Sequence, residues 1–164
     1  YSEITAYFPP RADIKERVSA TISKLQATHE HIIGVHLRQN DYAVFKGGKY
    51  LISQERTREI IEEYFTHSGK ERNKAILLIC SDGVVNPKIF EDFQIEISTE
   101  SAVTDLFLLS KTNVIIGSDS SFGNLAAYFG NIPHIVMQQE KMDWEYYREE
   151  TSYFDNKYAT LVQR

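Results

Sequence analysis

The stretch from residue 32 to residue 41, I-I-G-V-H-L-R-Q-N-D, constrains the fold most, because an apolar run gives way abruptly to polar side chains. A buried parallel strand has this pattern: its interior is apolar on both faces, and its carboxyl end delivers side chains to a crevice. Alternation along a strand places His36 and Arg38 on the same side. Arg38 offers a planar fork of donors that matches phosphate and stays charged at any working pH. The stretch therefore predicts a strand that ends at a site for an anionic ligand.

Two later segments repeat this pattern of an apolar run followed by polar residues. The apolar run at residues 75–80 is followed by Ser81 and Asp82, and the run at residues 113–117 is followed by S-D-S-S-F-G at residues 118–123. Helical spacing of apolar residues predicts four helices. They are expected over residues 12–26, between an N-cap at Ser53 and a stop at Gly69, over residues 102–110 and over residues 124–129. Because strands and helices alternate, we expect an α/β fold with a Rossmann-like, open, mainly parallel sheet flanked by helices.

The remaining segments are predicted from local signals. Residues 42–50 contain Gly47 and Gly48 and are expected to form a loop, and residues 87–90 a short helical turn. Short strands are expected at 95–97 and 132–137, the second near an edge of the sheet because it contains Pro133. In the aromatic and acidic tail we expect a helix over 143–150 and a last strand over 158–162.

Composition limits the class of protein. We expect 164 residues to form a single domain, 1–164. The net charge of -5 argues against non-specific nucleic-acid binding, and no apolar run approaches the roughly 20 residues that cross a bilayer. The single Cys80 fits a reducing compartment, so a cytoplasmic location is expected. Since the chain begins at Tyr1 without Met or a signal-like segment, we expect it to be a fragment.

The three polar strand ends are expected to meet, because the carboxyl ends of parallel strands lie on one edge of a sheet, where ligands bind. The Ser-rich run before the helix at 124–129 exposes backbone N–H groups to an anion, and the hydroxyls of Ser120 and Ser121 add donors. Asp82 suits a guanine edge or a pair of ribose hydroxyls. Structural explanations stay open: His36 as a hydrogen-bonding group of the core, the Ser run as an N-cap, and Arg38 with Asp41 as an ordinary ion pair.

Several well-defined motifs are missing from the sequence. It contains no G-x-G-x-x-G, no G-x-x-x-x-G-K-[ST] and no G-x-S-x-G. No Cys and His spacing suits zinc. We therefore expect no dinucleotide cofactor and no zinc site.

The motifs at the three strand ends resemble those of the fucosyltransferase superfamily. The run H-L-R-Q-N-D-Y at residues 36–42 is similar to the H-x-R-R-G-D-Y motif of α-1,2-fucosyltransferases and to the H-x-R motifs of α-1,6- and protein O-fucosyltransferases. Ser81-Asp82 resembles the second motif, S-D, of these enzymes. Asp105-Leu-Phe-Leu-Leu with the run N-V-I-I-G-S-D-S-S-F at residues 113–122 resembles the third motif. The resemblance covers about residues 8–137.

The resemblance implies the C-terminal, donor-binding domain of a GT-B glycosyltransferase that transfers fucose from GDP-fucose, with inversion and without metal. It implies that Arg38 holds the β-phosphate and stabilises its departure, and that His36 and Asp82 contact the guanosine. Ser120, Ser121 and the backbone of Phe122 are implied to bind the phosphates. Asp41 and Asp105 are implied to brace the motifs, and a glycan acceptor is implied to bind an N-terminal domain that this chain lacks.

The chain departs from the family motif at two neighbouring positions, with Gln39 in place of Arg and Asn40 in place of Gly, so one positive charge is missing. It also has Asp119 where the α-1,2 group usually has Asn. Two alternative functions stay open: a non-catalytic nucleotide-sugar-binding or interaction module, and another α/β enzyme that acts on a phosphorylated small molecule.

Overall fold

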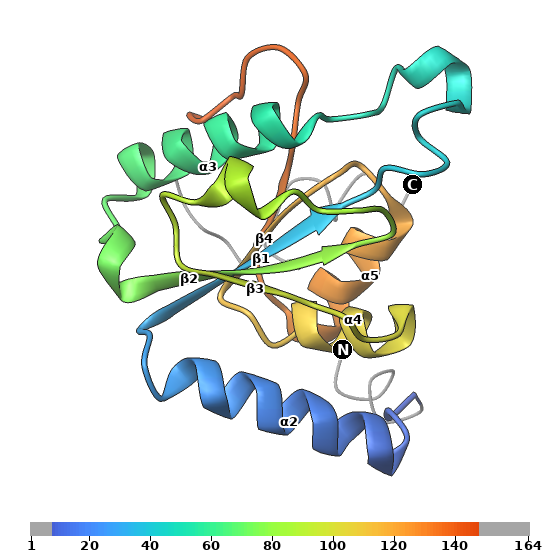
Figure 1. Cartoon of the computed structure of the whole chain (residues 1–164), viewed down its shortest axis with the longest axis vertical. Helices are drawn as coiled ribbons and strands as arrows, with labels where there is room; N and C mark the ends of the chain where they lie inside the picture. Colours follow the sequence, from blue (N-terminus) through green and yellow to red (C-terminus); the bar gives the residue numbers. More distant parts are fainter. Residues whose placement is uncertain (1–7, 148–164) are drawn as a thin grey trace.

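A computed structural model describes residues 8–147 of the chain, and within them five parallel strands form one sheet (Figure 1). The strand order is β3-β2-β1-β4-β5, with β1 in the centre. All neighbouring strands pair in parallel. The strands are β1 His31–Leu37, β2 Ala75–Ser81, β3 Ile95–Ile97, β4 Val114–Gly117 and β5 His134–Val136.

Helices cover both faces of this sheet, with α3 on one face and α2, α4 and α5 on the other (Figure 1). The α-helices are α2 Ala12–Gln26, α3 Gln54–Ser68, α4 Ala102–Leu109 and α5 Ser121–Gly130. Short 3₁₀ segments are η1 Phe45–Gly48, η2 Arg72–Lys74 and η3 Pro87–Phe90. The α/β Rossmann-like fold expected from the sequence is confirmed.

Helix α3 shows how local sequence signals set the element boundaries. The Ser53 hydroxyl accepts the Arg56 N–H at 3.1 Å, which satisfies one of the free donors at the helix start. Gly69 ends the helix with a left-handed φ of 68°, a conformation that costs glycine nothing. Between these ends Ile60, Ile61 and Tyr64 pack onto the sheet.

Two expectations need correction. Helix α5 begins at Ser121 rather than at residue 124, because the Ser120 hydroxyl caps it by accepting the Gly123 N–H at 3.3 Å. Residues 144–147 form turns instead of the start of a helix. There the Asp143 carboxylate accepts the Tyr146 N–H, and the Tyr147 hydroxyl accepts the N–H of Val136. Residues 148–150 and the strand expected at 158–162 lie outside the described residues.

The topology places a switch point between the neighbouring strands β1 and β4. The chain leaves β1 toward α3 on one face, whereas it leaves β4 toward α5 on the other, and β1 and β4 are neighbours in the sheet. At such a switch point the two connections diverge, which leaves room for a ligand at the carboxyl ends of the strands. None of the helices within residues 8–147 has the length and apolar character needed to cross a membrane.

Candidate functional site

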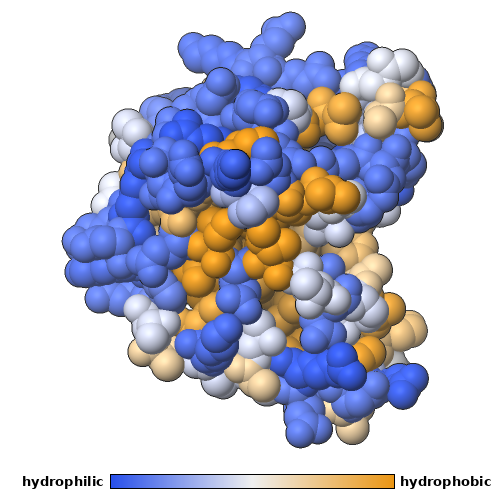
Figure 2. Space-filling view, viewed as in Figure 1, coloured by the Kyte–Doolittle hydropathy of each residue, from blue (hydrophilic) through white to orange (hydrophobic). Residues whose placement is uncertain are grey.

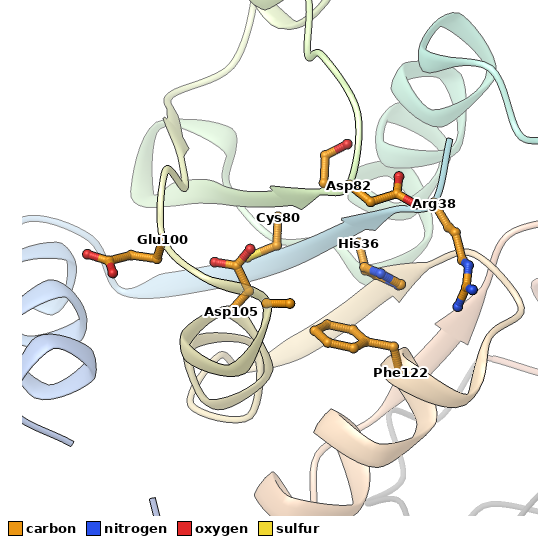
Figure 3. Close-up of a pocket in the computed structure, with 9 residues that line it drawn as sticks. His36, Arg38, Cys80, Asp82, Glu100, Asp105 and Phe122 are labelled. Atoms are coloured by element: carbon orange, nitrogen blue, oxygen red, sulfur yellow. The ribbon is translucent and has the colours of Figure 1, made fainter. Parts of the chain in front are cut away.

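A cleft of about 370 Å³ opens at the carboxyl ends of β1 and β2, beside the N-termini of α4 and α5 (Figure 3). Its volume lies in the range of sites for small ligands. Five residues singled out from the sequence meet in this cleft, although 86 positions separate the first from the last (122 minus 36). They are His36, Arg38, Asp82, Asp105 and Phe122, and Cys80, Ser81, Glu100 and Ala102 complete the lining.

His36 forms a wall of the cleft. Its side chain is buried, and its ring stacks on Phe122 with 4.9 Å between centroids. Its Nδ1 lies 3.5 Å from the Ser120 hydroxyl, which already accepts the Gly123 N–H. The Ser120 hydroxyl can donate its proton to Nδ1 or accept one from it, and in the first case the imidazole proton is on Nε2, where it can donate to a ligand.

The charge of His36 follows from its surroundings. Burial lowers its pKa to about 4, Asp82 counteracts this shift and Arg38 adds to it. The ring is therefore neutral at pH 7, and it can act as a hydrogen-bond donor without adding a positive charge to the cleft.

Arg38 is positioned by its backbone and held by a neighbouring carboxylate. Its N–H donates to the Ser118 hydroxyl at 3.2 Å. Its guanidinium bonds Asp41 through two nitrogens, with 2.5 Å between Nη2 and Oδ2, and lies 5.0 Å from the ring centroid of Tyr42. The hydrogen bond to Asp41 raises the pKa of Arg38. The ion pair kept open from the sequence is thus present, and since both side chains are partly exposed, a phosphate can replace Asp41 with little loss.

Two helix N-termini face the same cleft and add positive potential. The hydroxyl of Ser101 caps α4 by accepting the Thr104 N–H at 3.3 Å, as Ser120 caps α5. Ala102 and Phe122, each in the first turn of its helix, line the cleft. Because each helix start carries roughly half a positive charge, the two helices together with Arg38 favour an anion. Ser121 is exposed and does not line the cleft, so its contact with a phosphate stays a prediction.

The carboxylates that line the cleft differ in what already holds them. Asp82 Oδ1 accepts the N–H groups of Gln39 at 2.6 Å and Asn40 at 3.3 Å. Glu100 pairs with Arg17 on α2 at 3.1 Å. Asp105 is buried, accepts the Ser98 hydroxyl, and has a raised pKa because burial disfavours its charge. Asp105 is therefore the buried one of the three carboxylates that line the cleft.

The Cys80 thiol is poorly suited to act as a nucleophile. The pKa of the Cys80 thiol is raised well above its ordinary value, first by burial and then by the charge of Asp105, so little thiolate forms. Among residues 8–147, no three or more His, Cys, Asp or Glu side chains are grouped so that they could hold a metal ion.

Gln39, at the position of the second Arg in the fucosyltransferase motif that residues 36–42 resemble, does not line the cleft and bonds the loops beside it. Its amide nitrogen donates to the Ser81 hydroxyl at 2.8 Å, and its amide oxygen accepts from Gln54 at 2.8 Å. Gln54 in turn accepts the Asn86 N–H and donates to the Val84 carbonyl. In this chain the position braces the loops after β1 and β2 against the start of α3.

His134, on β5, is a buried neighbour of His36 that sequence reasoning missed, and it does not itself line the cleft. Its Nδ1 lies 3.0 Å from the Asn124 amide oxygen, and its buried Nε2 has no hydrogen-bond partner among residues 8–147. Burial and then the charge of His36 lower its pKa to about 3. Gly117 and Gly123 make room for both imidazoles, because a Cβ on Gly123 would lie 2.9 Å from His134 Cε1 and one on Gly117 would lie 3.1 Å from His36 Cβ. A polar residue in a strand of three gave no signal in the sequence.

No family model matches the chain, and no curated protein matches its sequence. Its fold is similar to solved fucosyltransferase structures. One is POFUT1 in complex with GDP-fucose, with a TM-score of 0.58 and 16% identity over 77% of this chain and 44% of that one. A second is a mutant of Arabidopsis thaliana FUT1 with GDP, with a TM-score of 0.54 and 14% identity over 82% of this chain and 35% of that one. A third is Bradyrhizobium NodZ α-1,6-fucosyltransferase soaked with GDP-fucose, with a TM-score of 0.52 and 16% identity over 81% of this chain and 47% of that one.

The chain therefore has a fucosyltransferase-like fold, as the motif resemblance predicted. It spans less than half the length of each of these three structures.

Proposed function

We propose that this chain is the donor-binding domain of a fucosyltransferase that uses GDP-fucose. The observation that carries the proposal is the cleft itself, in which Arg38, the neutral imidazole of His36 and two capped helix N-termini face one space of about 370 Å³. Such a set of donors suits a nucleoside diphosphate, because the phosphates carry charge and the nucleoside needs neutral partners. The fold similarity to proteins solved with GDP or GDP-fucose supports the same ligand.

The proposed reaction is a single displacement with inversion. An acceptor hydroxyl oxygen bonds to the anomeric carbon of fucose while the bond from that carbon to the β-phosphate oxygen breaks. The electron pair leaves with GDP, and the acceptor proton goes to a base on the acceptor side. Arg38 and the N-termini of α4 and α5 stabilise the charge that develops on the diphosphate, and this set of groups is why we propose a reaction without metal.

The guanine-reading carboxylate is proposed to be Asp82 or Asp105. The resemblance implies Asp82, one oxygen of which accepts two backbone N–H groups. Asp105 also lines the cleft, and one of its oxygens accepts the Ser98 hydroxyl, so each carboxylate has one oxygen left that can accept an N–H of guanine.

Calorimetric titration of GDP tests the proposal. Arg38→Ala is expected to weaken GDP binding by roughly 10- to 100-fold, because a charge-assisted hydrogen bond is worth about 1.5–3 kcal/mol. Arg58→Ala is the matched control, since Arg58 also makes exposed ion pairs but lies on α3. Unchanged GDP affinity in a folded Arg38→Ala variant would contradict the assignment.

The same titration separates the alternatives. Equal affinity for GDP, UDP and inorganic phosphate would favour an enzyme of phosphorylated small molecules over a GDP-sugar site. Of Asp82→Asn and Asp105→Asn, the variant that loses the preference for GDP over UDP identifies the guanine-reading carboxylate. GDP binding without fucose transfer by the full-length protein would favour a binding module.

A further inference from the structure

The loop that follows the Arg38 strand carries an exposed cluster of aromatic rings. We call residues 42–50 the aromatic loop; it projects from the carboxyl edge of the sheet between β1 and α3 (Figure 1). The rings of Tyr42, Phe45 and Tyr50 lie 5.8–6.2 Å apart between centroids. Val44 is 80% exposed and Phe45 is 49% exposed. Apolar side chains accordingly show at this end of the molecule (Figure 2).

The aromatic loop is tied to the candidate site. The Tyr42 hydroxyl donates to the Asp119 carbonyl at 2.6 Å, which joins the loop to the turn before α5. The Arg38 guanidinium lies over the Tyr42 ring. At the other end of the loop the Leu51 carbonyl accepts from Gln139 at 2.8 Å. An occupant of the rings would therefore lie beside the group proposed to hold the diphosphate.

The backbone of the aromatic loop is also preorganised. Lys46, Gly47 and Gly48 all have left-handed φ values, of 48°, 69° and 79°. Two glycines allow this conformation at no steric cost, and it turns the chain so that Phe45 and Tyr50 come together. Rings that are held in place before binding lose little conformational entropy when a ligand arrives.

The chemistry of the aromatic loop favours a hydroxylated ring over an apolar protein surface. Lys46 Nζ lies 5.5 Å from the Phe45 ring centroid, and Lys49 Nζ lies 5.8 Å from that of Tyr50. Residues 42–52 contain no Asp or Glu, so no carboxylate of this segment competes for these ammonium groups, which lie over the rings. A pyranose offers a face of C–H bonds to the negative face of an aromatic ring and hydroxyl oxygens to the ammonium groups.

From these contacts we infer that the aromatic loop is the platform on which a sugar ring of the acceptor glycan rests. This inference rests on the proposed function, because the transferred group would have to leave the diphosphate beside Arg38 and meet a hydroxyl on this side of the cleft. Phe45 and Tyr50 provide the stacking surface, and Lys46 and Lys49 orient the hydroxyls.

Amide chemical-shift titration of the chain with lactose, N-acetylglucosamine and methyl β-galactopyranoside tests the platform. At millimolar concentrations at least one of these sugars is expected to shift the amides of residues 42–50. Phe45→Ala and Tyr50→Ala should each weaken that response by roughly fivefold to tenfold, the effect of losing one ring contact. Val84→Ala is the matched control, since Val84 is 89% exposed at the same edge of the sheet but outside the aromatic loop.

Three results would overturn the platform: no response of residues 42–50 to any of the three sugars, a response that survives both ring substitutions, or self-association of the chain that Phe45→Ala abolishes. The last result would make the aromatic loop a contact between protein copies. GDP titrations on the same samples keep the two proposals apart. A sugar response at residues 42–50 without GDP binding would show that the aromatic loop binds sugars but would contradict the proposed function and, with it, the role of that sugar as an acceptor.

Discussion

The same strands end very differently on the two faces of the sheet. Toward α3, the end of β1 places Leu37 in the core, and the amides of Gln39 and Gln54 close the edge by hydrogen bonding to each other and to the loop after β2. Toward α4 and α5, His36 and Arg38 face a cleft. Alternating residues of one segment thus serve as packing on one side and as chemistry on the other.

The difference between the faces depends on small residues and helix ends. On the α4 and α5 side, Gly117 and Gly123 provide space, and both helices begin at the edge of the sheet. On the α3 side, the space is filled by large side chains and a bonded amide network. At this edge of the sheet, the face toward α4 and α5 therefore leaves room for a ligand, and the face toward α3 is closed by packed side chains and hydrogen-bonded amides.

Acid should destabilise the protein through the two imidazoles on the open face. Folding depresses the pKa of His36 to about 4 and of His134 to about 3, whereas the unfolded chain titrates near the ordinary 6.5. Their stabilising contribution is complete above pH 6.5 and is lost as pH falls toward 4 and 3, because the unfolded state binds the protons first. The loss is on the order of 1.4 kcal/mol per pH unit for each group.

Urea unfolding of wild type and His134→Asn at pH 7, 6 and 5 measures this loss. Asparagine can keep a donor toward Asn124 but does not titrate. The slope of the unfolding free energy against pH should therefore be smaller in the variant than in wild type, by the contribution of about one proton. Asp105, whose pKa burial raises, acts in the opposite sense and is common to both proteins. An identical slope in the two proteins would show that His134 does not titrate as its burial requires.

Gly123→Ala should test the space that Gly123 leaves for the buried His134 ring. Alanine in a helix is normally better than glycine by about 1 kcal/mol. Here the new Cβ would lie 2.9 Å from the buried His134 ring, so we expect a net loss of about 1–3 kcal/mol by thermal or urea unfolding. The same change in a His134→Ala background should cost much less, and equal costs in the two backgrounds would refute the steric reason.

Gln54→Ala probes the braced face and should have the smallest effect. It removes hydrogen bonds to Gln39, Val84 and Asn86, and we expect stability to fall by about 1 kcal/mol in urea unfolding. GDP affinity should change little, because Gln54 does not line the cleft. Gln54→Glu keeps the acceptor for the Asn86 N–H but loses the two donors, so its stability should lie between those of wild type and Gln54→Ala. A large loss of GDP binding in either variant would mean that the two faces are not independent.

Much of this architecture could be predicted from the sequence, because buried parallel strands and capped helices leave local signals. The apolar runs located β1, β2 and β4 to within one residue at each end, and Ser53 and Gly69 marked the boundaries of α3. The start of α5 was missed because a run of Ser and Gly favours loops as well as caps, and only the contact between Ser120 and Gly123 decides between them.

What the sequence could not provide was the order of the strands. Helix α4 faces the cleft because the chain passes from the outer strand β3 back across β2 and β1 to β4, and no local pattern encodes that path. Glu100 and Ala102 reach the cleft for this reason alone. His134 was missed because β5 is too short for its alternation to be read.

The Asp82 carboxylate has a mechanical consequence. It accepts two N–H groups from the loop after β1, and the Asn40 side chain donates back to the Asp82 carbonyl, so the loops that follow β1 and β2 are locked together. We expect two connections bonded in this way to open as one cooperative unit. A ligand that draws Arg38 away from Asp41 is therefore expected to disturb the loop after β2 as well as the loop after β1.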